Sequence, residues 1–428
     1  MSNIIKSSLP IAFVLLLISL GSCQDKCTET RTYLKYTPVK KALTEVRESF
    51  KAMPTQELQN PGKIYTFGSR LYIVDRGIGF HVVDNSNPSA PIFTEFIQLD
   101  GCLDLAMKGN TLYANQGPDI VAIAMDGEPR IIGRGEDILS DQNNSDSVIL
   151  RWESREVTEV VETNCDNQGN WRGNPRSFAN DDFSGGVSFE SSSTSSSVSD
   201  NNRVNSSGSS GSGVSGSMAR FSIVAGQLYV VSDWSMTTFD LDNDFRQISQ
   251  FNIGNGVETI FGTQDYLYLG TNVGMLIYDR NNGNTPTYVS QLSHARGCDP
   301  VVVQGDIAFV TLRGNSRCGQ AESGLYVVNL AEIRNPSLLS MHPMADPYGL
   351  GVRDDILMIC DGNAGLRVFD KSNLDFIGDS EISSDASVKA YDVILQDDIA
   401  ILSAEEGVYQ YEYDNAGKLN KLSTLIAK

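Results

Sequence analysis

Histidine and basic residues are scarce in this chain. Only three of its 428 residues are histidine, which leaves few candidates for zinc binding or histidine-based acid–base catalysis. Lysine and arginine number 33 against 53 aspartate and glutamate residues, a formal net charge of -20. Because nucleic-acid binding needs a basic footprint, we expect no nucleic-acid partner.

Sequence motifs for bound cofactors are also missing. Neither a Walker phosphate loop nor a dinucleotide-binding βαβ fingerprint occurs, and no G-x-S-x-G nucleophile turn is present. The acidic run Asp240-Leu241-Asp242-Asn243-Asp244 is similar to part of a calcium loop, but it lacks the glycine at position 6 and the glutamate at position 12. We therefore expect no cofactor and interpret this run as a turn.

Long apolar runs are absent as well. The clearest one, Ile11 to Leu20, is too short to span a bilayer. Because Lys6 precedes this run and small residues follow it, we predict an export signal over residues 1–22. The sequence Leu20-Gly21-Ser22-Cys23 resembles the lipobox of bacterial lipoproteins. That resemblance implies a lipid on Cys23, a membrane as partner, and a location at the outer membrane or cell surface. An ordinary secretory signal with a free cysteine is the alternative.

An internal repeat follows this amino-terminal segment. The repeat unit has a Leu-Tyr-apolar-apolar strand, with Ala or Met in place of Tyr in three copies, a turn that usually contains glycine, and a second apolar strand that ends in Asp or Asn. The clearest copies begin at Leu71 and Leu357. The second repeat position recurs seven times, and five of the six intervals are 39 to 50 residues long. These positions are Tyr72, Tyr113, Tyr229, Tyr268, Ala308, Met358 and Ala400.

A repeat of about forty residues with four short strands is typical of a β-propeller blade. An immunoglobulin-like array would need modules of about a hundred residues. We therefore predict an all-β chain in which residues 62–428 form a β-propeller of about seven four-stranded blades. Residues 23–61 are predicted to be a tether with a short helix.

The repeat also carries a family resemblance. Leu71-Tyr72-Ile73-Val74-Asp75, taken with Val82-Val83-Asp84-Asn85-Ser86-Asn87-Pro88, resembles the LVIVD repeat of bacterial surface and secreted proteins. The copy that begins at Leu228 departs from this pattern, since Ser232-Asp233-Trp234 replaces the glycine turn. The resemblance implies a propeller but indicates little about activity.

The one long interval of the repeat contains an insertion, residues 139–217. Its Val148–Trp152 and Val157–Val161 segments have strand-like sequences, which leaves open an added hairpin on a blade or a degenerate eighth blade. Residues 184–217 include sixteen serines in 34 positions. Because such a segment cannot bury enough apolar surface to offset the entropy of ordering, we expect it to be disordered.

Seven cysteines suit an oxidising compartment without proving disulfides. Cys298 precedes the first strand of its repeat and Cys318 follows the second strand. In a propeller these two turns emerge on the same face, so we predict a Cys298–Cys318 disulfide. Cys360 is interpreted as a packed thiol. The pairing of the remaining cysteines stays open: Cys27, Cys102 and Cys165.

A ring of polar residues is the strongest candidate for a ligand site. The third residue after each repeat Tyr position is polar in every copy: Asp75, Gln116, Ser232, Thr271, Thr311, Asp361 and Ser403. These residues end the second strands, on the face that commonly holds ligands. A sugar or small polar ligand could use this ring, with further side chains from adjacent turns: Arg296, Asp299, Arg313, Arg317 and Tyr348. Alternatively, short polar side chains at these positions cap turns and bind no ligand.

Two functions remain open at this point. The first is a noncatalytic, lipid-anchored binding or scaffold protein for a glycan, peptide or protein ligand, and we favour it because no catalytic constellation is visible. The second is a metal-assisted hydrolase or lactonase-like propeller that would use Asp75 and Asp361. Carboxylates that converge on one ion would separate the two.

Overall fold

The computed structural model describes residues 26–139, 146–164, 213–254, 256–281, 283, 285–293, 297, 300–314, 319 and 321–428. Several predicted residues lie outside these ranges: Cys23, Cys165, Arg296, Cys298, Asp299, Arg317 and Cys318. The export signal and the predicted disulfide therefore also lie outside the described residues. Among the described residues, no helix is long and apolar enough to cross a bilayer.

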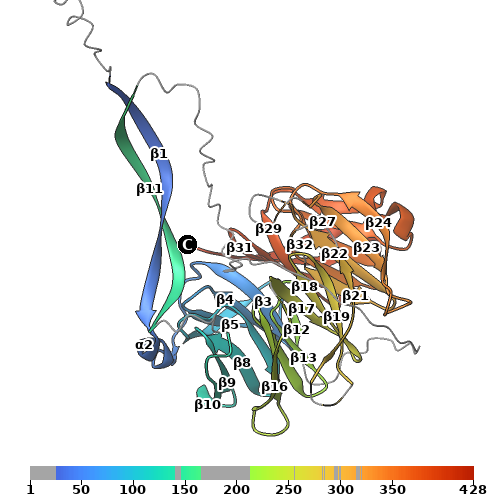
Figure 1. Cartoon of the computed structure of the whole chain (residues 1–428), viewed down its shortest axis with the longest axis horizontal. Coiled ribbons are helices and arrows are strands. Elements are labelled where there is room, and N and C mark those ends of the chain that lie inside the picture. Colours follow the sequence, from blue (N-terminus) through green and yellow to red (C-terminus); the bar gives the residue numbers. More distant parts are fainter. Residues whose placement is uncertain are drawn as a thin grey trace, which may run out of the picture. The chain divides into compact units, whose positions relative to one another are not determined.

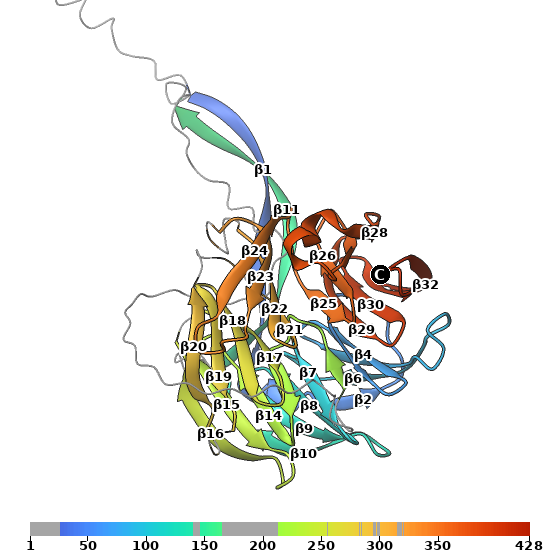
Figure 2. The same cartoon turned by 90° about the vertical axis from the view of Figure 1, so that its right-hand side faces the viewer.

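Contacts divide the chain into two units. The larger unit, residues 39–151 and 183–428, contains seven sheets of four consecutive strands each, and two of its short strands add to the first sheet. We number these sheets as blades 1 to 7 in chain order (Figures 1 and 2). Blade 1 contains β3 (Pro61–Phe67), β4 (Arg70–Asp75), β5 (Gly79–Asp84) and β6 (Ile92–Gln98), and blade 2 contains β7 (Leu105–Lys108), β8 (Thr111–Gln116), β9 (Asp119–Ala124) and β10 (Arg130–Gly135). Blade 3 contains β13 (Phe221–Val224), β14 (Gln227–Val231), β15 (Ser235–Asp240) and β16 (Arg246–Asn252), blade 4 contains β17 (Val257–Gly262), β18 (Tyr266–Thr271), β19 (Gly274–Asp279) and β20 (Thr287–Ser293), and blade 5 contains β21 (Val301–Gln304), β22 (Ile307–Leu312), β23 (Gly324–Asn329) and β24 (Ser337–Pro343). Blade 6 contains β25 (Leu350–Arg353), β26 (Ile356–Cys360), β27 (Leu366–Asp370) and β28 (Glu381–Asp385), and blade 7 contains β29 (Ala390–Gln396), β30 (Ile399–Ala404), β31 (Gly407–Tyr413) and β32 (Leu419–Ile426).

The blades form a closed ring. The first strand of each blade contacts the first strand of the next, in the order β3, β7, β13, β17, β21, β25 and β29, and β29 contacts β3. All neighbouring strands within a blade are antiparallel. The predicted seven-bladed β-propeller is therefore confirmed, and the described residues contain no eighth blade.

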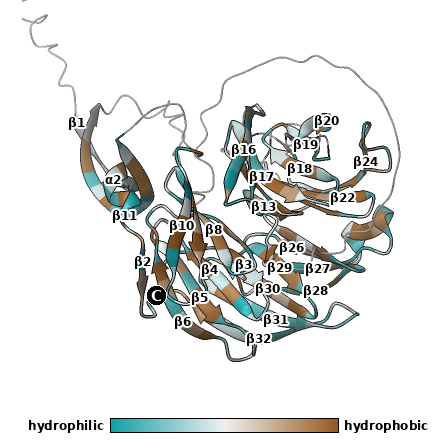
Figure 3. Ribbon diagram, turned by 90° about the horizontal axis from the view of Figure 1, so that it is seen from below, coloured by the Kyte–Doolittle hydropathy of each residue, from teal (hydrophilic) through white to brown (hydrophobic). Residues whose placement is uncertain are grey.

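The repeat sequence explains how each blade packs. Leu71, Tyr72, Ile73 and Val74 of β4 are all fully buried, because a middle strand is covered on both faces by the neighbouring blades. Brown, hydrophobic colouring follows middle strands of the blades in Figure 3. Strands buried on both faces have continuous apolar sequences rather than alternating ones. The Leu-Tyr-apolar-apolar motif, in which Ala or Met replaces Tyr in three copies, marks this middle strand of the repeat.

The repeat glycine has a steric cause. It begins the third strand, where the backbone of the outer strand passes very close. A Cβ atom added to Gly79 would lie 2.0 Å from the carbonyl oxygen of Ile97, and one added to Gly407 would lie 2.1 Å from that of Leu425. Because real Cβ atoms do not approach a carbonyl oxygen so closely, only glycine fits without movement of the outer strand.

The ring closes between blades 7 and 1 without exchange of strands. All four repeat strands of blade 1 come from the amino-terminal part of the propeller, and all four of blade 7 come from its carboxyl-terminal part. The amides of Asn85 and Gln410 hydrogen-bond to each other at 2.8 and 2.7 Å. The Lys428 N–H donates to the Leu58 carbonyl oxygen at 2.9 Å. One apolar cluster spans both blades and includes Ile73 and Ile401.

Four short elements surround blades 1, 2 and 6. Helix α2 (Leu43–Arg47) lies within the range where the sequence predicts a short helix, and β2 (Lys51–Met53) pairs with the outer strand β6. The 3-10 helix η2 (Leu374–Asp379) precedes β28. On the inner side of blade 1, β12 (Val214–Ser215) pairs with β3.

A two-stranded ribbon replaces part of the predicted tether. Strand β1 (Lys26–Ala42) pairs with β11 (Ser147–Asn164), and the described residues of the smaller unit, 26–38 and 152–164, lie in these two strands. The tether expected from residue 23 is therefore wrong over Lys26–Ala42. Val148–Trp152 and Val157–Val161 belong to the single strand β11, so they form neither a hairpin nor a blade. Both expectations failed because β1 and β11 pair with each other although more than a hundred residues separate them in the chain.

Candidate functional site

The predicted polar ring lies on one side of the propeller, where second strands end and first strands begin. We call this side the top face. All seven ring residues are buried, with at most 9% of their surface exposed. Each has at least one side-chain hydrogen bond within the chain. Burial and these bonds leave little of the ring available to a ligand.

Four of the ring hydroxyls bind backbone groups or adjacent turns. Thr271 Oγ1 donates to the Gly274 carbonyl oxygen at 2.7 Å, and Ser403 Oγ donates to that of Gly62 at 2.7 Å. Thr311 Oγ1 donates to the Tyr348 carbonyl oxygen, and Ser232 Oγ lies 2.9 Å from Ser235 Oγ. These contacts match the turn-capping alternative.

The ring carboxylates are engaged in the same way. Asp75 accepts hydrogen bonds from the N–H groups of Gln59 and Asn60 at 3.0 and 2.9 Å. Asp361 accepts from the Asp346 N–H at 2.7 Å and from Arg367 Nη1 at 3.0 Å. The described residues contain no group of three or more His, Cys, Asp or Glu side chains placed to hold one metal ion.

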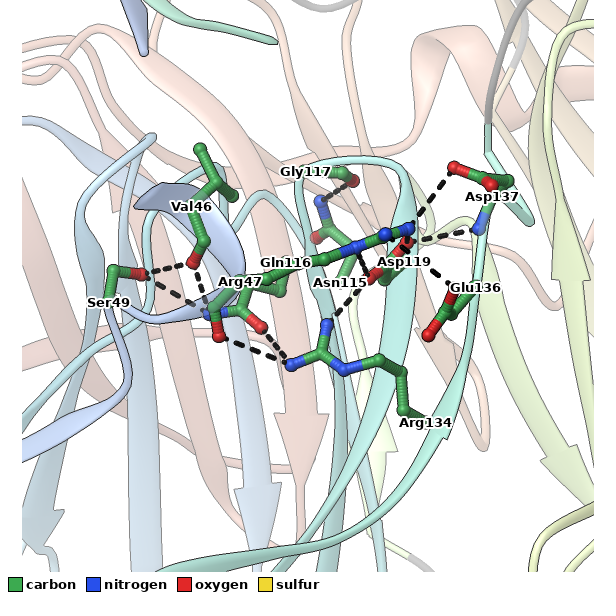
Figure 4. Close-up of polar contacts among 10 residues, drawn as sticks. All are labelled: Val46, Arg47, Ser49, Asn115, Gln116, Gly117, Asp119, Arg134, Glu136 and Asp137. Atoms are coloured by element: carbon green, nitrogen blue, oxygen red, sulfur yellow. Dashed lines mark hydrogen bonds and ion pairs between the residues drawn. The ribbon is translucent and has the colours of Figure 1, made fainter. Parts of the chain in front are cut away.

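Gln116 joins a polar cluster beneath helix α2 that the sequence did not indicate (Figure 4). Gln116 Nε2 donates to the Val46 carbonyl oxygen at 2.6 Å, and Arg134 Nη2 donates to Gln116 Oε1 at 2.6 Å. The fully buried Asp119 accepts hydrogen bonds from Arg47 Nε at 2.8 Å and from Arg134 Nη1 at 2.6 Å. Burial opposes the charge on Asp119, but the hydrogen bonds from Arg47, the Asp137 N–H and Arg134 lower its pKa. The cluster fixes α2 against blade 2.

A second buried polar cluster lies at the inner strands, where the end of the insertion packs. Lys63 Nζ of β3 lies 2.6 Å from Asp104 Oδ2, and both side chains are only 7% exposed. The Arg220 N–H also donates to Asp104 Oδ2, at 2.6 Å. Burial lowers the pKa of Lys63, and the Asp104 carboxylate opposes that change. This cluster connects blades 1, 2 and 3.

Asp392 continues this cluster into blade 7. Its Oδ1 accepts hydrogen bonds from Ser217 Oγ and the Ser217 N–H, both at 3.2 Å. The carboxylate also fills the space beside two glycines: a Cβ added to Gly216 would lie 1.9 Å from Asp392 Oδ2, and one added to Gly349 would lie 2.2 Å from Oδ1. Burial raises the pKa of Asp392 to about 6. Since Leu350 N–H donates to Ser217 Oγ at 2.8 Å, Ser217 also reaches blade 6.

These contacts correct the expected extent of disorder. Residues 213–217 belong to the Ser-rich segment 184–217, yet Val214–Ser215 forms β12 and Ser217 is buried. The Gly213 N–H donates to Tyr65 Oη at 3.0 Å. The Ser-rich composition predicted disorder for the whole segment. Composition carries no information about tertiary contacts, and the last five residues contact the buried partners described above. Residues 184–212 lie outside the described residues.

Two deletions of different length test this boundary. Removal of residues 184–212 is expected to change the melting temperature little, because the free energy of loop closure varies slowly with length. Removal of residues 184–217 is expected to cost about 2 kcal/mol more, since the buried Asp392 loses its donors from Ser217. Thermal unfolding of both proteins measures the difference. Equal melting temperatures for the two deletions would show that β12 and Ser217 contribute nothing.

Two further predicted residues, Arg313 and Tyr348, meet on the top face. The Arg313 guanidinium carbon lies 3.8 Å from the centre of the Tyr348 ring, and both residues are buried. Tyr348 in turn contacts the ring of Tyr391 edge-on at 5.1 Å. Lys389 Nζ lies 5.7 Å from the Tyr391 ring and 3.2 Å from Glu405 Oε2. This row of side chains crosses blades 5, 6 and 7.

Comparisons with known proteins do not assign this chain to a family. No protein-family model and no curated protein matches this chain. Among solved structures, the computationally designed Ika8 protein is 9% identical with a TM-score of 0.48, over 86% of this chain and 92% of that one. BamB from Moraxella catarrhalis is 8% identical with a TM-score of 0.46, over 89% and 91%. Saccharomyces cerevisiae Sqt1 is 8% identical with a TM-score of 0.48, over 88% and 87%. Likeness at this level indicates nothing about a ligand.

Proposed function

We propose that this chain is a lipid-anchored, extracytoplasmic β-propeller that binds a glycan, peptide or protein ligand on its top face and catalyses no reaction. The propeller fold supports a binding or scaffold role in general, and the ligand has to be argued from the site itself. The lipobox-like sequence that ends at Cys23 supports the anchor, and the resemblance to the LVIVD repeat supports a place among bacterial surface proteins.

The row from Arg313 to Lys389 carries this proposal. Arg313 and Tyr348 are buried and form the base of the row, whereas Tyr391 is half-buried and the Lys389 side chain is 29% exposed. The exposed part thus offers an aromatic ring beside an ammonium group. Aromatic faces stack on sugar rings and apolar side chains, and a cation binds a carboxylate. A glycan or peptide with an acidic group fits this chemistry.

The same contacts do not favour the hydrolase alternative. A calcium ion needs six to eight oxygen ligands, whereas the carboxylates of Asp75 and Asp361 already accept hydrogen bonds from the surrounding backbone. Their described contacts hold the turns before β3 and β25 in place. The binding role instead uses Tyr391 and Lys389, which are partly exposed, and an acidic ligand would compete with Glu405 for the Lys389 ammonium group.

A binding screen tests the proposal. The full chain is applied to arrays of acidic glycans and acidic peptides, and Tyr391→Ala with Lys389→Ala is expected to weaken the strongest signal about tenfold or more. Tyr288→Ala is the matched control, because Tyr288 is 57% exposed on the outer strand of blade 4. Unchanged binding by the double variant, with its melting temperature preserved, would contradict a site at this row.

A further inference from the structure

Residues 213–219 run along the inner strands of the propeller, and we call them the inner segment. Its strand β12 pairs with β3 of blade 1. The Gly213 N–H donates to the Met107 carbonyl oxygen of β7 at 3.4 Å, and the Ile260 N–H of β17 donates to that of Ala219 at 2.9 Å. Each first strand pairs with its second strand on one edge, so these bonds use the opposite edge, which faces the axis of the ring. The inner segment therefore lies in the central channel of the propeller.

One side chain of the inner segment connects blades 6 and 7. Ser217 Oγ accepts a hydrogen bond from the Leu350 N–H of β25 at 2.8 Å and donates one to Asp392 Oδ1 of β29 at 3.2 Å. Leu350 lies two residues after Tyr348, and Asp392 directly follows Tyr391. A single hydroxyl thus joins the two stretches of backbone that carry the aromatic rings of the row.

The inner segment also packs tightly behind this row. Met218 and Tyr391 both pack against an apolar cluster of blades 6 and 7 that contains Tyr348. A Cβ atom on Gly216 would lie 1.9 Å from Asp392 Oδ2, so no space remains between the segment and this carboxylate. A shift of the inner segment must therefore move Asp392 or leave a void beside it, and close-packed interiors resist both.

Two backbone hydrogen bonds also join blades 6 and 7 near the row. The Gly349 N–H donates to the Tyr391 carbonyl oxygen at 2.8 Å, and the Ala390 N–H donates to that of Gly362 at 3.1 Å. Ser217 differs from these groups because it belongs to neither blade and ends the long insertion between blades 2 and 3. Among these three links, only the one through Ser217 makes the position of the row depend on the insertion.

We propose that Ser217 positions the row from Arg313 to Lys389 and that the inner segment thereby regulates ligand binding on the top face. Ser217 is buried and acts through other residues. It holds the backbone beside Tyr348 and Tyr391, whose rings lie edge-on at 5.1 Å. A site whose contact residues are fixed by a supporting layer binds with less loss of entropy. The regulatory part rests on the proposed function, whereas the positioning part rests on the hydrogen bonds of Ser217.

Ser217→Val and Ser217→Thr form a matched pair, because the two side chains have the same shape and only threonine keeps the hydroxyl. Nitration of the full chain with tetranitromethane, quantified by mass spectrometry at each tyrosine, reports how firmly the row is held. Burial raises the pKa of Tyr391, so a loosened ring should react faster. We expect Tyr391 to react several-fold faster in Ser217→Val than in Ser217→Thr. Ser217→Ala, which adds no methyl group, should follow Ser217→Val.

Two controls separate positioning from a general loss of stability. Tyr288, which is 57% exposed on the outer strand of blade 4, should react equally in all variants. Ile277→Val removes a buried methyl group from blade 4, and it should leave the rate at Tyr391 unchanged. Equal rates at Tyr391 in Ser217→Val and Ser217→Thr, or an equal increase in Ile277→Val, would overturn the positioning role.

Binding measurements test the regulatory part separately. An oligomer of galacturonic acid and a hexaglutamate peptide serve as acidic probes, and calorimetry measures the affinity of each. For a probe that binds the wild type, Ser217→Val should weaken binding about fivefold relative to Ser217→Thr, although neither variant changes a contact residue. Faster nitration at Tyr391 with equal affinities would overturn the regulation alone. If neither probe binds the wild type, the proposed function and its regulation fail together for these ligands, and nitration still decides the positioning role.

Discussion

Asp104→Ala is expected to lower the free energy of unfolding by about 3 to 5 kcal/mol. The substitution removes the carboxylate that binds Lys63 Nζ at 2.6 Å and the Arg220 N–H at 2.6 Å, deep among the inner strands. Truncation of one partner of a buried ion pair is costly because the other charge keeps its desolvation penalty without its counterion. Urea unfolding of the full chain measures this loss.

A double variant separates the charge effect from lost packing. Lys63→Met with Asp104→Leu removes both charges and keeps apolar volume, so it should recover much of the stability that Asp104→Ala loses. Glu57→Ala provides an exposed control, since its ion pair with Lys428 lies in solvent and contributes little. If Asp104→Ala is no more destabilising than Glu57→Ala, then Lys63 and Asp104 do not form a structural pair.

Asp392→Asn is expected to become more stable relative to the wild type as the pH rises. Burial raises the pKa of Asp392 to about 6 in the folded chain, from a usual value of 3.8. The folded state therefore favours the protonated carboxyl, and the wild type loses stability as the pH rises from below 4 through 6. A shift of about two units corresponds to about 3 kcal/mol at full ionisation. The asparagine variant does not titrate and avoids this loss.

The pH dependence of the stability difference between Asp392→Asn and the wild type tests this expectation most directly. About 2 kcal/mol of the difference between variant and wild type should develop between pH 4.5 and 7.5. Asp385→Asn is the matched control: burial opposes its charge, but hydrogen bonds from Ser387, Lys421 and Tyr411 lower the pKa of Asp385 to about 2. Its folded and unfolded pKa values both lie below this window, so its difference should stay constant there. A constant difference for Asp392→Asn as well would contradict a buried, raised carboxyl.

The repeat pattern determined the propeller because its cause is local. Each middle strand is buried on both faces, so its sequence is continuously apolar. The repeat glycine is required because a Cβ atom at its position would lie about 2 Å from an outer-strand carbonyl oxygen. These constraints act within about forty residues and recur in most blades. Periodicity therefore predicted about seven blades and the polar residue near the end of each second strand, whereas the structure excluded an eighth blade among the described residues.

Sequence reasoning missed Lys63, Asp104, Asp119 and Asp392. A lone charged residue has the same letter whether it lies in solvent or among inner strands, and in a chain with 53 acidic residues nothing local singles these out. The ring residues show the converse. Their polar character was predicted from the sequence, but their hydrogen-bond partners come from neighbouring turns. The backbone N–H groups of Gln59 and Asn60, for example, donate to Asp75.

Sequence alone determined the blade repeat and the turn glycines, because each depends on a short stretch of chain; the export signal stays a prediction. Only the tertiary structure decided that β1 pairs with β11, that residues 213–217 pack against the inner strands, and that Arg313 stacks on Tyr348. In the first two cases the partners are more than a hundred residues apart in the chain, and in the third they come from neighbouring blades. Their meeting depends on closure of the ring and on the path of the insertion, which no local pattern of residues encodes.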